Sequence, residues 1–80
     1  MKKELAIKQI YDDFVNKVTL TEEEKDVLIR YIRNDSIVKI ANDTSQGTAT
    51  ISRIIANIKF KYERYKKLEI TKLMLLTEKK

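Results

Sequence analysis

Small polar side chains and positive charges are concentrated in the middle of this sequence. Between Ser36 and Lys61 the chain reads SIVKIANDTSQGTATISRIIANIKFK. Hydroxyl and amide groups exchange hydrogen bonds with a partner, and lysine and arginine pair with phosphate or carboxylate groups. The stretch therefore offers the chemistry of binding rather than of bond cleavage.

The residues on which most enzymes depend are absent. The chain has no cysteine and no histidine, which excludes a disulfide framework, a thiolate nucleophile, an imidazole acid or base and the usual zinc sites. Adjacent glutamates on a helix point in different directions. We therefore predict no catalytic residue, no metal ion and no cofactor, and we interpret one carboxylate cluster as solvated helix capping: Glu22, Glu23, Glu24 and Asp26.

Length and composition indicate one small helical domain. Eighty residues allow a single domain with a thin core. The absence of proline, the single glycine and the abundance of lysine, glutamate, isoleucine and leucine predict an all-α fold. Charges interrupt the N-terminal sequence where a signal peptide needs an apolar core, and no apolar run has membrane-spanning length. We expect a cytoplasmic protein that contacts no membrane.

Apolar periodicity predicts a first helix over residues 3–17. Its apolar side chains are spaced four, three and four residues apart and form one stripe. They are Ile7, Tyr11, Phe14 and Val18. We assign residues 1–19 to an N-terminal helix that packs on the core. The alternative is that part of this stripe forms a dimer contact, because so small a chain gains from a partner's core.

The second predicted helix has a well-marked start. Thr21 and Glu24 have the spacing of a capping box, in which each side chain accepts a hydrogen bond from the other residue's backbone N–H. Asn34 and Asp35 can end the helix without glycine. Its predicted apolar face consists of Val27, Leu28, Tyr31 and Ile32.

The next segment has the outline of a helix-turn-helix. Ser36 is a plausible N-cap for a short helix, Ile37 to Asp43, that buries Ile37, Ile40 and Ala41. A polar connector follows, and its Gly47 can take a positive φ. A fourth helix then begins near Thr48 and turns one face inward, with Ile51, Ile54, Ile55 and Ile58.

The outer side of this fourth helix is small and polar at its N-terminal end. In helix-turn-helix motifs that end enters the major groove of DNA. Residues 36 to 67 sum to a charge of about +5, which favours contact with phosphate, although solvated lysines are the alternative interpretation. The predicted DNA-binding residues are Gln46, Thr48, Ala49, Thr50, Ser52, Arg53, Asn57, Lys59, Lys61 and Arg64.

The chain after Lys67 is more apolar, and its pattern no longer follows the earlier stripe. We predict a kink or short break near residues 66–69, followed by a separate C-terminal helix over residues 67–80 that mediates dimerisation. Residues 20–66 then form the DNA-binding core. The tail residues that no longer extend the earlier stripe include Leu68, Ile70, Leu73, Met74 and Leu76.

The run TSQGTATISR, Thr44 to Arg53, resembles the second half of the helix-turn-helix in the Trp repressor superfamily. LTEEEKDVL, KIA, TIS and NI, with Lys61 behind them, also match the spacing of LuxR-type DNA-binding domains, and the segment is similar to region 4 of sigma factors. The first resemblance implies that Arg53 stands where the Trp repressor holds its corepressor. It also implies that base edges are reached by Thr48, Ala49, Thr50 and Ser52.

The sequence departs from the Trp repressor pattern in ways that bear on ligands. Ser45 replaces the usual turn glycine, and the second helix is several residues shorter. Tryptophan binding is therefore not transferred to this chain. A small-molecule corepressor is conceivable, but no other residue supports one.

Together these observations predict a bundle of about five helices that binds double-stranded DNA as a symmetric homodimer. The half-sites are expected to lie about one helical turn apart, and regulation of transcription is the expected consequence. The alternative is a small helical interaction module that binds a sigma factor or an RNA polymerase subunit. The modest net charge of +5 and the apolar tail leave that alternative open.

Overall fold

Helices are the only regular secondary structure in the part of the chain that the structure describes. The computed structural model describes the backbone of residues 1–78 and the side chains of residues 1–68. No described helix is both long and apolar enough to cross a membrane. The prediction of an all-α fold with about five helices is confirmed, and the elements are α1 (Lys2–Leu5), α2 (Lys8–Lys17), α3 (Glu22–Ile32), α4 (Ile37–Asp43) and α5 (Thr48–Glu78).

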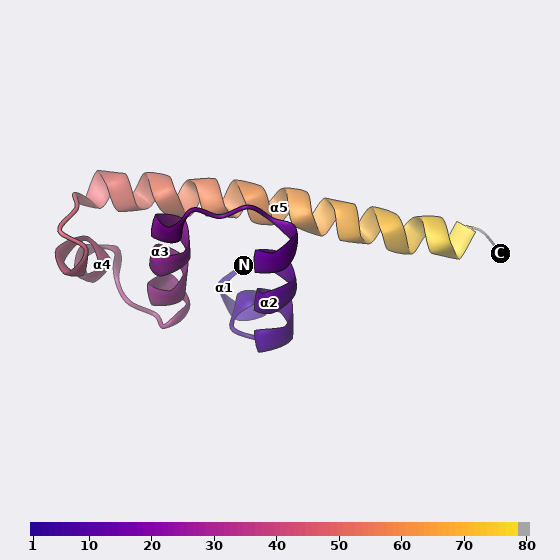
Figure 1. Cartoon of the computed structure of the whole chain (residues 1–80), viewed down its shortest axis with the longest axis horizontal. Coiled ribbons are helices and arrows are strands. Elements are labelled where there is room, and N and C mark those ends of the chain that lie inside the picture. The colour runs from indigo at the N-terminus through magenta and orange to yellow at the C-terminus, as the bar shows by residue number, and fades with distance from the viewer. Residues whose placement is uncertain (79–80) are drawn as a thin grey trace.

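The long helix α5 is the axis on which the other helices are arranged (Figure 1). Helices α3 and α4 pack against its N-terminal half, α2 packs against it further along, and α1 contacts α2 and α3. The molecule is 53 Å long and only 20 by 17 Å across. Beyond α2, the C-terminal turns of α5 lie beside no other helix of the described chain.

The predicted break near residues 66–69 is wrong, because α5 is continuous over 31 residues. Lysine, leucine and glutamate dominate this junction, and all three are strong helix formers. The change in apolar phase alters which side of the helix is apolar without interrupting the backbone. Lys79 and Lys80, the end of the predicted C-terminal helix, lie outside the described residues.

The predicted single helix over residues 3–17 is also wrong, because the chain bends between α1 and α2. Ile7 has extended backbone angles, φ −81° and ψ 119°, and precedes α2 as its N-cap. Leu5 and Phe14, both fully buried, would face opposite ways in one continuous helix, since nine residues rotate the helix by about 180°. The bend lets both side chains enter the core, and Ile7 becomes exposed.

The core at the middle of α5 is aromatic. The ring of Phe14 meets the rings of Tyr62 and Tyr65 edge-on, with both centroid distances at 5.4 Å. Burial of Tyr62, together with its hydrogen bond to Glu4, raises the pKa of its hydroxyl to about 12. The Tyr65 hydroxyl donates to the carboxylate of Asp13. These contacts attach α1 and α2 to α5.

Both predicted N-caps are confirmed. The Thr21 hydroxyl accepts from the Glu24 N–H at 3.1 Å, and the Glu24 carboxylate accepts from the Thr21 N–H at 3.0 Å. The Ser36 hydroxyl accepts from the Lys39 N–H at 3.1 Å. The starts of α3 and α4 are therefore fixed by hydrogen bonds within four consecutive residues.

Helices α3 and α4 both end in a Schellman arrangement, with a non-glycine residue in the left-handed region. Asn34 has φ 74° and Ser45 has φ 56°, whereas Gly47 does not have a positive φ. At the end of α4, the Gln46 N–H donates to the Ala41 carbonyl at 2.9 Å, which is the 6→1 bond of the motif. The prediction that Gly47 supplies the positive φ is therefore wrong.

Exchanging the residue types at positions 45 and 47 should stabilise the protein. Ser45→Gly removes the steric cost of a left-handed residue and should raise the free energy of unfolding by about 1 kcal/mol. Gly47→Ser should add a few tenths of a kcal/mol, because serine caps a helix better than glycine and a Cβ at this position meets no atom within 4 Å. Urea unfolding of the two single variants tests this. A loss of stability in Ser45→Gly would contradict it.

Candidate nucleic-acid interface

The inner face of α5 is buried against α3 and α4 as the sequence predicts. The side chains of Ile51, Ile54, Ile55 and Ile58 are all buried. On α4, Ile40 and Ala41 are buried as well. The small Ala41 allows α4 to lie close to α5, and the turn 44–47 then leads directly into the first turn of α5 (Figure 1).

Ile37 differs from its prediction, because 39% of its surface is exposed. It occupies the first position of the short helix α4, at the end nearer to the loop after α3. There it lines the edge of a shallow surface pocket with Tyr31 and Ile55. The core contact of α4 therefore rests on Ile40 and Ala41 alone among the three predicted residues.

Most of the predicted DNA-binding residues lie on the open surface of α5. The cations of Arg53, Lys59 and Arg64 form no ion pair with any residue whose side chain the structure describes. The arrangement presents hydroxyl and amide groups near the N-terminus of α5 and positive charge further along. The exposed members of the predicted set are Thr48, Ala49, Thr50, Ser52, Arg53, Asn57, Lys59 and Arg64.

Gln46 and Lys61 are turned toward the body of the protein instead. The Gln46 amide nitrogen donates to the Glu23 carboxylate at 2.9 Å. The Lys61 ammonium donates to the Glu24 carboxylate at 2.8 Å and to the Thr19 carbonyl at 3.1 Å. Lys61 therefore ties α5 to the start of α3, and the structure does not place it with the exposed cations.

Glu24 is the acidic partner in this tie and is largely buried, with 8% of its surface exposed. Burial raises the pKa of its carboxyl group, but the hydrogen bonds from Lys61 and from the Thr21 backbone outweigh that effect and lower the pKa overall. The same carboxylate thus caps α3 and holds α5. The spacing of Thr21 and Glu24 predicts the capping role, whereas no local pattern predicts the contact of Glu24 with α5.

A second set of surface ion pairs includes Asp43 of α4 and Arg30 of α3. The Asp43 carboxylate accepts from Lys39 at 2.7 Å and from Arg30 at 3.4 Å. Arg30 also pairs with Asp26 of its own helix at 3.1 Å. The hydrogen bond from Lys39 lowers the pKa of Asp43. Of these pairs, the one between Arg30 and Asp43 joins the two helices, whereas the other two lie within α4 and within α3.

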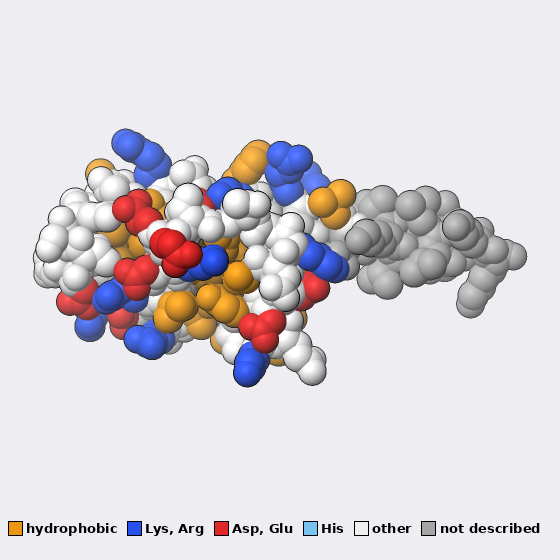
Figure 2. Space-filling view, in the orientation of Figure 1, with side chains coloured by type: hydrophobic (Ala, Val, Ile, Leu, Met, Phe, Trp, Pro, Cys, Tyr) orange, Lys and Arg blue, Asp and Glu red, His pale blue; other side chains and the backbone are white. Residues whose placement is uncertain are grey.

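Phe60 is an exposed residue outside the predicted DNA-binding set. It is 64% exposed and lies on the same helix as the exposed cations. Along the upper edge of the molecule, where α5 runs, basic side chains lie between hydrophobic ones (Figure 2). The exposure of Phe60 could have been predicted from the spacing of the buried isoleucines, because position 60 falls outside the stripe that they define.

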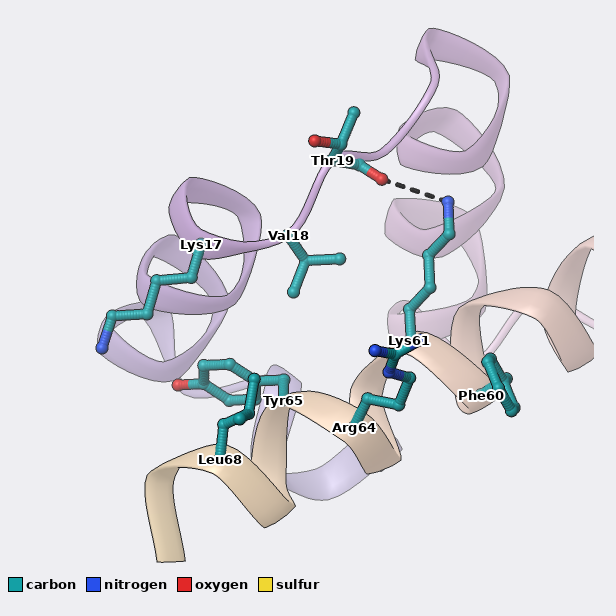
Figure 3. A pocket seen from close by; sticks show the side chains of 8 residues that line it. All are labelled: Lys17, Val18, Thr19, Phe60, Lys61, Arg64, Tyr65 and Leu68. Carbon is teal, nitrogen blue, oxygen red and sulfur yellow. Dashed lines mark hydrogen bonds between the residues drawn. The ribbon is translucent and has the colours of Figure 1, made fainter. Parts of the chain in front are cut away.

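A pocket of about 380 Å³ lies beside Phe60, where the segment between α2 and α3 approaches α5. Figure 3 shows Phe60 and Leu68 at its two ends along α5, with Arg64 between them. Lys61 reaches across the pocket to the Thr19 carbonyl. The pocket is mainly apolar and has a positively charged rim.

Comparisons with models of protein families, with curated proteins and with solved structures found no match for this chain. The resemblance to helix-turn-helix families therefore stays a prediction.

Glu24→Gln should destabilise the protein at neutral pH and much less in acid. At pH 7 it removes the charged partner of Lys61, at an expected cost of about 1–3 kcal/mol. Because the pKa of Glu24 is lowered in the folded state, its contribution is present above the ordinary carboxyl pKa of 4.5 and is lost as the pH falls through the lowered value. Urea unfolding of both proteins between pH 7 and pH 3 measures this difference.

Glu22→Gln is the matched control for that experiment. Its side chain is 95% exposed and, among the side chains that the structure describes, pairs only with Lys25 of the same helix, at 3.6 Å. This variant should change the free energy of unfolding by less than about 0.5 kcal/mol at every pH. Equal effects of the two variants, or an effect of Glu24→Gln that does not depend on pH, would contradict the assigned role of Glu24.

Proposed function

We propose that this protein binds double-stranded DNA and regulates transcription, through a helix-turn-helix formed by α4, the turn 44–47 and the first turns of α5. The observation that carries the proposal is the outer face of α5, where exposed small polar residues are followed by cations without ion-pair partners among the described side chains. The proposal includes a homodimer, as expected for a motif that binds paired half-sites.

The N-terminal part of this face is suited to contact with base edges. Ser52 and Asn57 can donate and accept hydrogen bonds, and Arg53 can donate two parallel hydrogen bonds to guanine. Ala49 and Thr48 are small enough for the backbone of α5 to approach the floor of a groove. All five residues are exposed.

The charge distribution along α5 supports contact with phosphates. Residues 48–68 contain six lysines and arginines and a single acidic residue, Glu63. Lys61 pairs with Glu24, and Lys66 pairs with Glu4 at 3.6 Å. The remaining cations, Arg53, Lys59, Arg64 and Lys67, have no ion pair with a described side chain. Such cations release counterions from DNA when they bind phosphate, which is the main source of sequence-independent affinity.

A protein-interaction module is the second candidate function, with a sigma factor or a polymerase subunit as the partner. The observation that favours it is the exposure of Phe60, because aromatic side chains are enriched in protein–protein interfaces and contribute little to phosphate contact. In the DNA-binding proposal, Phe60 needs a separate explanation.

Binding to duplex DNA should fall steeply with salt, and exposed cations of α5 should set the slope. We expect Lys59→Ala to reduce the slope of log affinity against log salt by about 0.9. Lys8→Ala removes the same charge from an exposed position on α2 and should leave the slope unchanged. Fluorescence anisotropy with a random-sequence duplex tests both variants. Absence of binding at low salt, or binding that is independent of salt, would contradict the proposal.

Residues near the N-terminus of α5 should determine sequence preference instead. Ser52→Ala should change the base preferred at one position of a selected site, with a loss of about 1–3 kcal/mol on the original sequence and little loss on random DNA. Selection of bound sequences with wild-type and variant proteins tests this. An identical preference in both proteins would remove Ser52 from the base-contacting set.

A further inference from the structure

The pocket between α5 and the segment that joins α2 to α3 has a largely apolar wall. Val18, the ring of Tyr65 and Leu68 all line it, and the Tyr65 hydroxyl is already bound to Asp13. Leu68 is 63% exposed, so this wall is accessible to a ligand. The volume of about 380 Å³ lies at the lower end of the range of small-molecule sites in proteins, about 300–1,000 Å³. The pocket therefore has the size for a small apolar molecule.

The charges at the rim of the pocket are not balanced. No acidic residue is among the described residues that line it, whereas three cations are: Lys17, Lys61 and Arg64. Lys17 pairs with Asp13 at 3.3 Å, and Lys61 pairs with Glu24 at 2.8 Å. Arg64 forms no ion pair with any side chain that the structure describes. One positive charge therefore remains uncompensated, on a guanidinium group that can donate two parallel hydrogen bonds to a carboxylate.

The hydrogen bond from Lys61 to the Thr19 carbonyl limits the length of a ligand. This bond, at 3.1 Å, bridges α5 and the facing segment. In Figure 3, Phe60 lies on one side of the bridge, and the other side holds Val18, Tyr65 and Leu68. A polypeptide that ran through the pocket would break the bridge, whereas a short molecule fits beside it without moving Lys61. The pocket therefore favours a small ligand over a peptide segment.

We propose that this pocket binds a small apolar carboxylate, a molecule with a hydrocarbon body and one negative charge. Its carboxylate accepts hydrogen bonds from the Arg64 guanidinium, and its hydrocarbon body lies against Val18, Tyr65 and Leu68. The second charge of a phosphate monoester would be left unpaired beside the apolar wall, which is unfavourable. The inference goes beyond the proposed function and does not rest on DNA binding.

Titration of isotope-labelled protein with octanoate, followed by NMR, tests the proposal. Chemical-shift changes should be concentrated at residues 17–19 and 60–68 and should be absent from α4. Butanoate carries the same charge on a shorter chain and should bind at least about tenfold more weakly, because it buries less apolar surface. Equal affinities for octanoate and butanoate would show a surface anion site only and would overturn the proposal, as would the absence of shifts with octanoate.

Arginine variants test the anchor of the carboxylate. Arg64→Gln should weaken octanoate binding about tenfold and leave the binding of uncharged octanol unchanged. Arg53→Gln is the matched control, because Arg53 is an exposed arginine of α5 that does not line the pocket. It lies roughly 16 Å further along the helix, beyond the Debye length of about 8 Å at physiological salt, and its loss should leave octanoate binding unchanged. Equal effects of the two variants would overturn the proposal.

Variants of exposed apolar residues test the wall. Leu68→Ala should weaken octanoate and octanol alike, about threefold or more, because both lose buried apolar contact. Val38→Ala shortens another exposed apolar residue, on α4 and 59% exposed, and should change neither affinity. An unchanged octanoate affinity in Leu68→Ala would overturn the proposal. A protein that binds octanoate but no DNA would support the pocket and contradict the proposed function, and one that binds DNA but no octanoate would do the reverse.

Discussion

The fold depends on burial of a single apolar face of α5. Helices α2, α3 and α4 all pack on that face, and the isoleucines at 51, 54, 55 and 58 are buried there together with Tyr62. A core this small gives the domain only a small free energy of unfolding. It also assigns the opposite face of α5 to solvent over the same residues. The exposed face is therefore a consequence of how the chain folds, and the proposed DNA contacts lie on it.

The cations of α5 show why charge placement must be judged in three dimensions. Lys61 and Arg64 are three residues apart and look equivalent in the sequence. Lys61 is bound by Glu24 and by the Thr19 carbonyl, so moving it to a phosphate would leave the largely buried Glu24 without its partner. Arg64 has no such partner among the described side chains. A cation such as Arg64 can therefore bind an external anion without breaking an ion pair that stabilises the fold.

Features that depend on neighbouring residues could be predicted from the sequence, and features that depend on distant contacts could not. The Thr21–Glu24 capping box and the isoleucine stripe of α5 are set by helical periodicity over a few residues, and both were predicted correctly. The pairing of Lys61 with Glu24 joins positions 37 residues apart, so no local pattern contains it. The bend at Ile7 has the same origin, because it is needed only when Leu5 and Phe14 share one core. Within the candidate site, exposure at eight positions followed from the stripe, while the inward positions of Gln46 and Lys61 followed from partners on α3.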